Sequence, residues 1–524
     1  MPSRRFTSCG QHSHPVPVTQ QSDVRTTDTV IVGNGPSALF LSYLLHGNVP
    51  IYDPTTHGPH PDPVLHSKLT QIGSGRPLYD ALDSPKTAET LTEHFPSSTF
   101  MSYSSQALPI NVLLDTLVRP NADTEIGESK SRIRWERDPA RRVDHLVLGD
   151  AGKAGGQWAE DAIGANWDCE TLSYAELLSL PGYSFPDHCK RTHRRAMQDL
   201  VRPTRREVAA YYSAYPKAVG ISSEVFTSVH AQRVRQLPQG GFELRVSHRS
   251  SSTSSSKTMT IICTHLVLAT GIYSHVIPPP PIFASLLHNS NNSYTTNPSA
   301  APLLVVGSGF TAADVMIAAK DAGRKICHIY KWDPTHPSPL KGCHPQAYPE
   351  YAQIYRRMKA VISTANSSLK SPSPPADDSY EGFPNARVIS ASNDGRIRIL
   401  TADGDIVERV VGGLKYCVGR RGSLEYLSPE LRKAVGVVDA GWISGDTMRW
   451  RVEEDLEVVN GVFVVGSLTG DSLVRFGFGG CTYAAGKILG HKTEESKKKG
   501  GRREEAERGV EAVDVTRRTS CVIT

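Results

Sequence analysis

The stretch that decides the fold is Thr27–Pro54, which reads TDTVIVGNGPSALFLSYLLHGNVPIYDP. A short run rich in β-branched residues, Thr29–Val32, is typical of a buried parallel strand. It leads into the G-x-G-x-x-A turn Gly33–Ala38, and an apolar helix, Leu39–Leu45, follows. A second short strand, Val49–Tyr52, ends in an aspartate. This order of elements predicts a dinucleotide-binding unit of the Rossmann type.

Each part of the glycine turn has a physical role. Gly33 permits a tight change of direction, and Gly35 lets a pyrophosphate approach the backbone. Ala38 is small enough for the helix to pack on the strand, and the helix N-terminus offers N–H groups to phosphates. Asp53 lies 20 residues after Gly33, where an acid accepts hydrogen bonds from a ribose. The alternative is a glycine-rich turn of some other α/β unit.

The composition narrows the class of protein. The chain has 524 residues, too many for one core, so two or three domains are expected. The net charge of +5 is small for this length, and no basic stripe with interleaved aromatics predicts nucleic-acid binding. The nine cysteines include no C-x-x-C pair, which argues against a metal knuckle or a dithiol relay and is typical of a reducing compartment. No apolar run is long enough to cross a bilayer.

The stretch Ala301–Lys331 repeats the opening pattern. Leu303–Val306 and Ile326–Tyr330 are its predicted strands, and Ala313–Ala322 is its predicted helix. The turn between them again ends in a small residue. Five of its residues are predicted to hold a second dinucleotide: Gly307, Ser308, Gly309, Thr311 and Ala312.

The second strand of this copy ends in a cation where the first copy ends in an acid. Lys331 stands in the place of Asp53, and Arg324 lies just before the strand. An acid at this position repels a 2′-phosphate and a cation attracts it, so the pair predicts NADPH over NADH. The alternative is that Arg324 and Lys331 are solvated surface charges.

Three further segments complete the predicted first domain. Gly155–Trp158, a GG-x-W turn, brings backbone close to a flat group, with a plain turn and a packing Trp as the alternative. The strand His265–Gly271 ends in Ala-Thr-Gly, as a hinge-like element of oxidoreductases with two dinucleotides does. Gly461–Val465 predicts a last strand, and Gly479–Leu489 a helix whose positive end would stabilise a reduced cofactor. Asp471 is the acid nearest to that turn.

The predicted domain limits follow from these motifs. Residues 1–27 are expected to be a disordered leader and residues 491–524 a disordered charged tail. Residues 28–295 form the first part of the first domain, with a helical insertion at about 54–142; residues 296–415 form the second domain, and 416–490 close the first. The chain ends in a C-a-a-X shape at Cys521, whose prenylation would attach an otherwise cytoplasmic protein to a membrane. The alternative is an accidental cysteine.

Taken together, these residues resemble the oxidative-stress-induced growth inhibitor family, which is similar to flavin monooxygenases and more distantly to the N-hydroxylating monooxygenases of ornithine and lysine. The similarity runs over about residues 28–490. Its more specific stretches are VLHSKL at Val64–Leu69, NVLLDTLVRP at Asn111–Pro120, HLVLGDAGKAGGQW at His145–Trp158, LSYAELLSLP at Leu172–Pro181, and the helix around Val208–Tyr215.

The resemblance implies an α/β fold of two Rossmann-like domains, with the NADPH domain inserted in the FAD domain. It implies FAD in the first site and NADPH in the second, and no metal. The residues that it places at the FAD site are Gly33, Gly35, Pro36, Ser37, Ala38, Asp53, Gly156, Gln157, Trp158, Val229, Thr270, Gly271, Asp471 and Gly480.

The implied activity is that of an NADPH-dependent FAD monooxygenase. It would transfer one oxygen from O₂ to an amine nitrogen or a thioether sulfur of a small molecule or modified peptide, and no acid or base is assigned. Two alternatives stay open: a growth or stress regulator that binds FAD with little turnover and acts through a partner, and an NADPH-dependent reductase of quinones.

Overall fold

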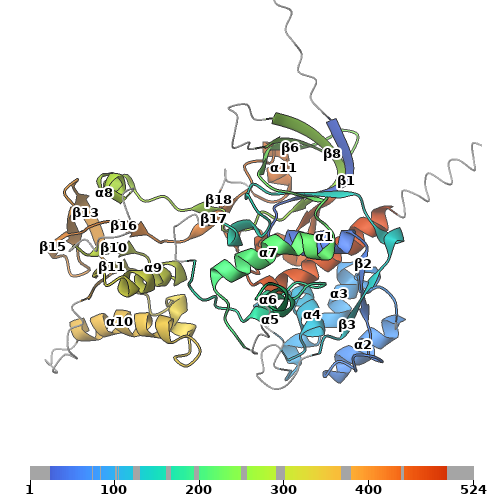
Figure 1. Ribbon diagram of the computed structural model, residues 1–524, viewed down its shortest axis with the longest axis horizontal. Helices are drawn as coiled ribbons and strands as arrows, with labels where there is room; N and C mark the ends of the chain where they lie inside the picture. The colour runs from blue at the N-terminus through green and yellow to red at the C-terminus, as the bar shows by residue number, and fades with distance from the viewer. Residues whose placement is uncertain are drawn as a thin grey trace, which may run out of the picture.

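The structure is a computed structural model and consists of two α/β units joined by a narrow ribbon (Figure 1). It describes residues 24–73, 75–82, 84–100, 103, 106–121, 130–160, 167–193, 200–248, 257–290, 301–366, 379–437 and 442–492. Each unit contains a sheet with parallel strands, and the second unit interrupts the chain of the first. The predicted fold class, two Rossmann-like units with one inserted in the other, is therefore confirmed.

The larger unit is built on an eight-stranded sheet. A path of six strands has the order β19-β20-β8-β1-β4-β5, and β7 joins β8 to β6. β1 pairs in parallel with both β4 and β8, and β20 pairs in parallel with β8, so segments from both ends of the chain share one sheet. The strands are β1 Val24–Val32, β4 His145–Leu148, β5 Val225–Phe226, β6 Val229–Gln236, β7 Phe242–His248, β8 Lys257–Leu268, β19 Glu457–Val459 and β20 Val462–Val464.

The central strands of this sheet are buried on both faces, which is why they read as continuous apolar runs. Val30 and Ile31 in β1, and Leu266 in β8, have no exposed surface. β1 begins at Val24, so residues 24–27 belong to the sheet and not to the expected leader.

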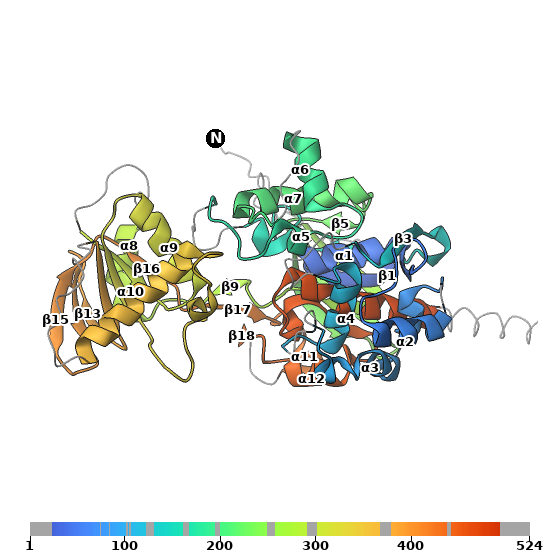
Figure 2. The ribbon, with the colours of Figure 1, turned by 90° about the horizontal axis from the view of Figure 1, so that it is seen from below.

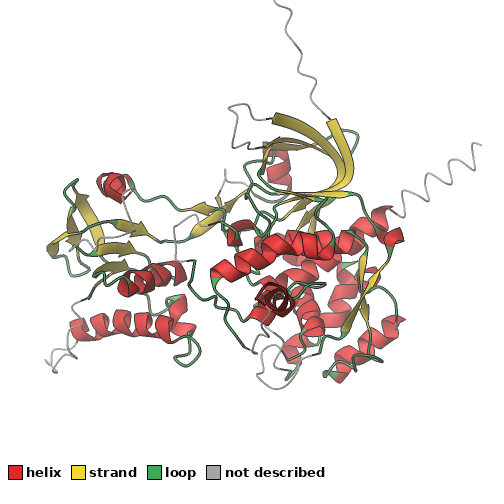
Figure 3. Ribbon diagram, in the orientation of Figure 1, coloured by secondary structure: helices red, strands yellow, loops and turns green. Residues whose placement is uncertain are grey.

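The helices of the larger unit lie beside this sheet (Figure 3). A typical one, α7, begins at a capping box made by Thr204 and Glu207 and ends at Gly220 in the left-handed conformation. The helices are α1 Pro36–Leu45, α2 Pro63–Gly73, α3 Pro85–Thr92, α4 Pro109–Val118, α5 Ala175–Leu178, α6 Phe185–His193, α7 Arg205–Val219, α11 Pro429–Ala434, α12 Arg449–Glu454 and a last helix over 478–492. That last helix extends two residues into the expected tail.

The second strand of the opening motif does not join the main sheet, contrary to the prediction. β2, Asn48–Tyr52, pairs antiparallel with β3, Ile133–Arg137, in a separate two-stranded sheet. The strand beside β1 is β4, which follows α1 only after residues 46–144. The insertion therefore starts before β2, and it includes α2, α3 and α4.

The smaller unit has a parallel sheet in the order β12-β11-β10-β16 and a three-stranded antiparallel sheet, β13-β14-β15. Its core contains Leu304 together with Phe283 and Leu286, so this unit starts before residue 296, where the sequence placed it. Tyr416 still pairs with Val306 of this unit. The elements are α8 Ala284–Ser290, β10 Leu303–Val306, α9 Phe310–Asp321, β11 Ile326–Tyr330, α10 Pro349–Asn366, β12 Tyr380–Pro384, β13 Arg387–Ala391, β14 Arg396–Leu400, β15 Ile406–Val410 and β16 Leu414–Tyr416.

The two units are joined by a ribbon of three short strands. β17, Arg420–Ser423, pairs with β9, His275–Val276, and with β18, Trp442–Ile443. Figure 2 shows this ribbon between the two units. Because both chain crossings run through it, the ribbon is the covalent connection between the units.

Candidate functional site

The first cavity lies where β1, β4 and β8 end, and it holds about 420 Å³. Parallel sheets of this kind bind ligands at the carboxyl ends of their strands. The wall comes from the glycine turn after β1, the GG-x-W turn, the start of β6, the segment after β8 and the C-terminal part of the chain. The residues used below are Gly33, Gly35, Pro36, Ser37, Asp150, Gly156, Gln157, Trp158, Val229, Thr270, Gly271, Tyr273, Arg420, Gly466 and Ser467.

The glycine turn of the first cavity has two different requirements. Gly33 has φ +116°, and a Cβ there would lie 2.3 Å from the carbonyl oxygen of Ala269. Its N–H donates to Leu148 O at 2.7 Å, at the end of β4. A side chain at Gly33 is thus excluded by the neighbouring strand. By contrast, a Cβ at Gly35 would meet no atom within 4 Å, so Gly35 leaves open space beside the turn.

The second cavity repeats this construction in the smaller unit and holds about 1090 Å³. Gly307 has φ +139°, and a Cβ there would lie 2.2 Å from Cys417 O. Its N–H donates to Ile329 O at 2.9 Å, in β11. Gly309, like Gly35, faces open space. The wall residues used below are Gln157, Trp158, Arg205, Tyr273, Gly307, Ser308, Gly309, Thr311, Asp314, Lys331 and Arg420.

Both cavities lie at the beginning of a helix. α1 starts after Gly35 and α9 after Gly309, and neither cap residue makes a side-chain hydrogen bond to its helix. The first N–H groups of a helix need partners from outside the helix and carry partial positive charge. The two turns are therefore suited to phosphate groups.

The two cavities meet. Gln157, Trp158, Tyr273 and Arg420 line both of them. Trp158 packs against Tyr212 of α7 with ring centroids 6.1 Å apart, and Arg420 Nη1 lies 3.5 Å from Gln157 Oε1. Two ligands that fill the cavities therefore approach each other at this shared wall.

Most of the residues predicted from the sequence line these cavities. Of the FAD set, Gly33, Gly35, Pro36, Ser37, Gly156, Gln157, Trp158, Val229, Thr270 and Gly271 line the first. Of the NADPH set, Gly307, Ser308, Gly309, Thr311 and Lys331 line the second. Ala38 and Ala312 have no exposed surface and lie inside their helices, where a small residue is needed for packing.

Asp53 is not part of the site, which corrects its sequence-based role. It follows β2, outside the main sheet, and does not line the first cavity. Its carboxylate accepts hydrogen bonds from Thr55 and Thr56, and Arg134 Nε lies 2.7 Å away. The bonds from Thr56 and Thr55, with help from Arg134, hold the pKa of Asp53 well below its usual range. Asp53 therefore stabilises a turn of the insertion.

Asp150 occupies the position that the sequence assigned to Asp53. It follows β4, the parallel neighbour of β1, and it is exposed in the wall of the first cavity. The signal was present in the sequence, because an acid two residues after the strand His145–Leu148 precedes the GG-x-W turn. Sequence reasoning missed it since the expected spacing had already been satisfied by Asp53.

Asp471 and Gly480 also lie away from the wall of the first cavity. Asp471 accepts hydrogen bonds from Leu108 N and Asn111 Nδ2, and it pairs with Arg449. The N–H of Gly480 donates to Asn111 Oδ1 at 2.8 Å. These groups tie the C-terminal segment to α4. The C-terminal residues in the wall are Gly466 and Ser467.

Arg324 lies at the wrong end of its strand for the role assigned to it. It precedes β11, and its guanidinium lies near Gly413, at the amino ends of the strands. A Cβ added at Gly413 would be 3.4 Å from Arg324 Nη2. Lys331 follows β11 at the carboxyl end and lines the second cavity. Arg205 and Arg420 also line this cavity, and sequence reasoning did not select them.

One acid lies in the wall of the second cavity. Asp314, one turn into α9, accepts a hydrogen bond from the Tyr351 hydroxyl at 2.8 Å. Burial raises the pKa of Asp314 to about 6, against the effect of the Tyr351 bond and of Arg205. Its charge therefore changes near neutral pH.

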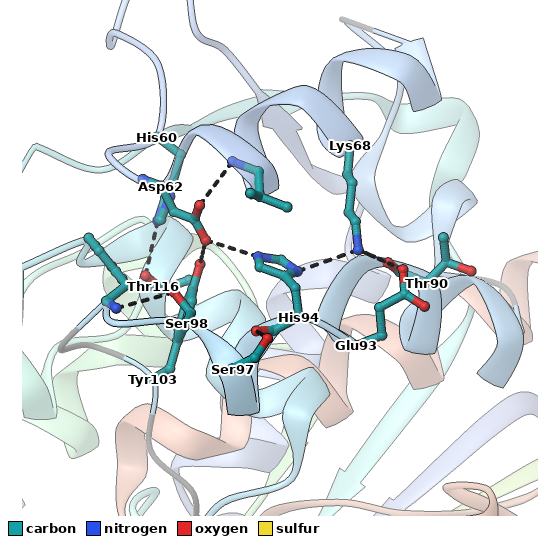
Figure 4. Close-up of polar contacts among 12 residues, drawn as sticks. His60, Asp62, Lys68, Thr90, Glu93, His94, Ser97, Ser98, Tyr103 and Thr116 are labelled. Atoms are coloured by element: carbon teal, nitrogen blue, oxygen red, sulfur yellow. Dashed lines mark hydrogen bonds and ion pairs between the residues drawn. The ribbon is translucent and has the colours of Figure 1, made fainter.

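A polar cluster in the insertion lies outside both cavities (Figure 4). Asp62 accepts hydrogen bonds from Val64 N, His94 and the Tyr103 hydroxyl. Lys68 donates to Thr90 O and to Glu93, and its third contact is His94 Nδ1 at 3.4 Å. All three donors of the ammonium group thus have partners. The cluster joins α2 to α3, and we interpret it as a structural tie.

The findings on metal-binding and membrane-spanning features concern the described part of the chain only, residues 24–492 with their gaps. There, no group of three or more His, Cys, Asp or Glu side chains could hold a metal ion. Over the same ranges, no helix combines the length and apolar character that a membrane crossing requires. Cys521, the predicted prenylation site, lies outside the described residues.

Among solved structures, two enzymes are similar to this chain over most of its length. Bacillithiol disulfide reductase from Bacillus cereus is 12% identical, with a TM-score of 0.49, and covers 89% of this chain and 100% of its own. Ornithine hydroxylase from Pseudomonas aeruginosa is 13% identical, with a TM-score of 0.47 and coverage of 89% and 99%.

No protein-family model matches the chain. Oxidative stress-induced growth inhibitor 1 of Mus musculus is 27% identical over 526 residues, which cover 94% of this chain and all of that protein. Oxidative stress-induced growth inhibitor 2 of Homo sapiens is 25% identical over 496 residues, 87% of this chain and 92% of that protein. The predicted resemblance is confirmed: the curated homologues of this chain are the oxidative stress-induced growth inhibitors.

Proposed function

We propose that this chain is a flavoprotein oxidoreductase that holds FAD in the first cavity and NADPH in the second. We further propose that it transfers one oxygen atom from O₂ to an amine nitrogen or a thioether sulfur. The observation that carries the proposal is the wall that the two cavities share, formed by Gln157, Trp158, Tyr273 and Arg420. A hydride donor in one cavity meets an acceptor in the other only if such a junction exists.

The first cavity fits an adenine dinucleotide. Its wall includes Asp150 and Val229, the open turn at Gly35, and Thr270 and Ser467. Asp150 would accept hydrogen bonds from the adenosine ribose, and the start of α1 would receive the pyrophosphate. The part beside Gln157 and Trp158, which also line the second cavity, would hold the flavin ring.

The second cavity fits a nicotinamide dinucleotide with an extra phosphate. Gly309 leaves open space beside the start of α9, where the pyrophosphate would lie. Lys331 at the end of β11 stands where a 2′-phosphate is recognised in such folds. Arg205 and Arg420 add positive charge to the same wall. These three cations and the N–H groups at the start of α9 would attract the phosphates of the coenzyme.

Bound FAD would supply the electron transfer and the activation of O₂. The residues of the chain would position it and exclude water. The Trp158 ring packs against Tyr212 of α7, and the backbone of Gly155 in the same turn lies so close to Tyr212 that an added Cβ would be 2.9 Å from that side chain. We assign no proton donor for the oxygen transfer.

The direct test uses the purified full chain. We expect it to contain bound FAD, to oxidise NADPH faster when an amine or a sulfide is added, and to give a product that has gained one oxygen atom by mass spectrometry. The variant Gly309→Val should keep FAD and lose NADPH oxidation, because its side chain enters the second cavity only. NADPH oxidation that a quinone accelerates and an amine or sulfide does not would favour a reductase. Bound FAD without NADPH oxidation would favour a regulator, and absence of FAD would contradict the proposal as a whole.

A further inference from the structure

The ribbon is not the only bridge between the two units. Two segments of the larger unit, residues 167–175 and 200–206, run antiparallel to each other. Backbone bonds join them, from Thr171 N to Pro203 O at 2.9 Å and from Arg205 N to Cys169 O at 3.0 Å. We call this pair of segments the strap. It extends from the start of α7 toward the smaller unit.

The strap contacts the smaller unit through one buried arginine. The Arg202 side chain is 8% exposed. Nε donates to Thr171 O within the strap at 2.7 Å, whereas Nη1 donates to Ala347 O at 3.0 Å and Nη2 to Glu350 at 2.7 Å, both across the interface. A planar guanidinium can satisfy several acceptors in fixed directions, which an ammonium cannot.

The surrounding contacts close the same interface. The Arg202 guanidinium carbon lies 4.7 Å from the centre of the Tyr348 ring, and the Tyr348 hydroxyl donates to Leu172 O of the strap at 2.8 Å. Leu172 packs against the core of the smaller unit. The strap thus has a charged anchor, a stacked ring and an apolar contact in one place.

On both units, residues at this interface are connected to residues in the cavity walls. On the smaller unit, Tyr351 follows Glu350 and donates to Asp314 in the wall of the second cavity. On the larger unit, the strap continues into α7, whose Tyr212 packs against Trp158 in the shared wall. On each side, a few residues in packing or hydrogen-bond contact connect the interface to a cavity.

We propose that Arg202 is a positioning residue that fixes the orientation of the two cavities toward each other, so that hydride transfer occurs across the shared wall. This inference rests on the proposed function. With the ribbon alone the smaller unit is attached along one line, and with the strap it is attached at two separated places. Errors of about 1 Å between reacting groups cost rates of up to about 100-fold, so such a second attachment matters for catalysis.

The test compares Arg202→Ala with Arg206→Ala. Arg206 belongs to the same strap, but its side chain is 62% exposed and pairs with Asp168 within the larger unit. For Arg202→Ala, anaerobic stopped-flow mixing with saturating NADPH should show flavin reduction slowed about tenfold or more. Reoxidation of chemically reduced enzyme by O₂ should stay within about twofold, because it involves the first cavity. Affinity for NADP⁺ is measured alongside, because Arg205 of the strap lines the second cavity, and saturating NADPH keeps any change in that affinity out of the reduction rate. Arg206→Ala should match the unchanged protein in all three.

Two further variants keep the proposal testable if Arg202→Ala folds poorly. Arg202→Lys retains the charge but not the fork, so an intermediate rate is expected. Glu350→Gln keeps the shape of the side chain that accepts from Arg202. It should therefore slow flavin reduction less than Arg202→Ala does.

A second measurement needs no cofactor. In the apoprotein, hydrogen exchange of peptides covering 167–175 and 344–351 should be faster in Arg202→Ala and unchanged in Arg206→Ala. Unchanged exchange would overturn the contact itself. Faster exchange with an unchanged rate of flavin reduction would overturn the positioning role. If the parent protein binds no FAD or is not reduced by NADPH, the proposed function fails and the positioning role with it, while the exchange result still reports on the strap.

Discussion

The two cavities are built on the same hydrogen-bond plan, yet their strands come from different parts of the chain. Gly33 donates to Leu148 of β4 as Gly307 donates to Ile329 of β11. Ala269 donates to Val32 at 2.9 Å as Cys417 donates to Val306 at 2.7 Å. In the smaller unit β11 follows α9 at once, whereas in the larger unit residues 46–144 separate α1 from β4. The sheet position, and not the distance along the chain, therefore decides which residue faces the ligand.

The sharpest way to break this comparison is to add one methyl group to each first glycine. Gly33→Ala and Gly307→Ala both force a Cβ against a backbone carbonyl at positive φ. We expect each to cost about 2–5 kcal/mol of unfolding free energy, from overpacking and backbone strain. Gly33→Ala should abolish FAD retention, and Gly307→Ala should abolish NADPH binding with FAD retained.

Urea unfolding and flavin absorbance measure both effects. Gly323→Ala is the matched control, since φ there is +68° but no atom lies within 4 Å of the added carbon. It should cost about 1 kcal/mol, the backbone term alone. Equal costs at all three glycines would mean that the close carbonyls do not matter.

The second prediction separates Asp150 from Asp53. Asp150→Ala should weaken FAD binding about tenfold, because a charge-assisted hydrogen bond to the ribose is lost. Asp53→Ala should leave the FAD dissociation constant unchanged, since its carboxylate is engaged with Thr55, Thr56 and Arg134. Titration of the apoprotein with FAD, followed by flavin fluorescence, distinguishes the two. An effect confined to Asp53→Ala would restore the assignment based on sequence spacing.

The third prediction concerns the two cations beside β11. Lys331→Glu should reduce the preference for NADPH over NADH about five- to tenfold, because an exposed anion replaces an exposed cation. Arg324→Lys, at the opposite end of the strand, should not change the preference. The ratio of kcat/KM values for the two coenzymes is the measurement. A preference unchanged by Lys331→Glu would point to Arg205 or Arg420 as the phosphate partner.

The smallest expected effect is a pH dependence of ligand binding in the second cavity. The pKa of Asp314 is raised to about 6 from its ordinary value of 3.8, so the side chain is ionised at pH 8 and neutral at pH 5. As pH falls through 6, NADH should bind about threefold more tightly, since an anion beside the pyrophosphate is removed. NADH is used because it has no titrating 2′-phosphate. The raised pKa also means that ionised Asp314 destabilises the fold above pH 6, and that this penalty disappears as pH falls toward 4.

Asp314→Asn is the control for this dependence. Its NADH affinity should be high at both pH values, and its stability at pH 8 should exceed that of the parent chain. Isothermal titration of the FAD-loaded protein at pH 5.5 and pH 8 measures the affinity. A tightening at low pH that persists in Asp314→Asn would assign the titration to another group.

The local elements of both cavities could be predicted from the sequence, but one long-range pairing could not. The turns at Gly33 and Gly307 have strong local signals, because the glycines and the flanking apolar runs are contiguous. Asp53 satisfied the spacing rule and Asp150 did not, and only the pairing of β1 with β4 decides between them. That pairing spans an insertion, so local spacing could not connect the acid after His145–Leu148 with the glycine turn at Gly33. The error at Arg324 was of another kind, since a residue before a parallel strand lies at the end opposite the glycine turn.

The sharing of one sheet by β1, β8 and β20 has a consequence for how the protein is made. β20 is translated after the whole smaller unit, whose strands β10, β11, β12 and β16 lie within residues 303–416. The smaller unit can thus complete its sheet on the ribosome while the larger one still waits for its edge. During synthesis the order of maturation is therefore expected to be the reverse of the order in which the two glycine turns emerge.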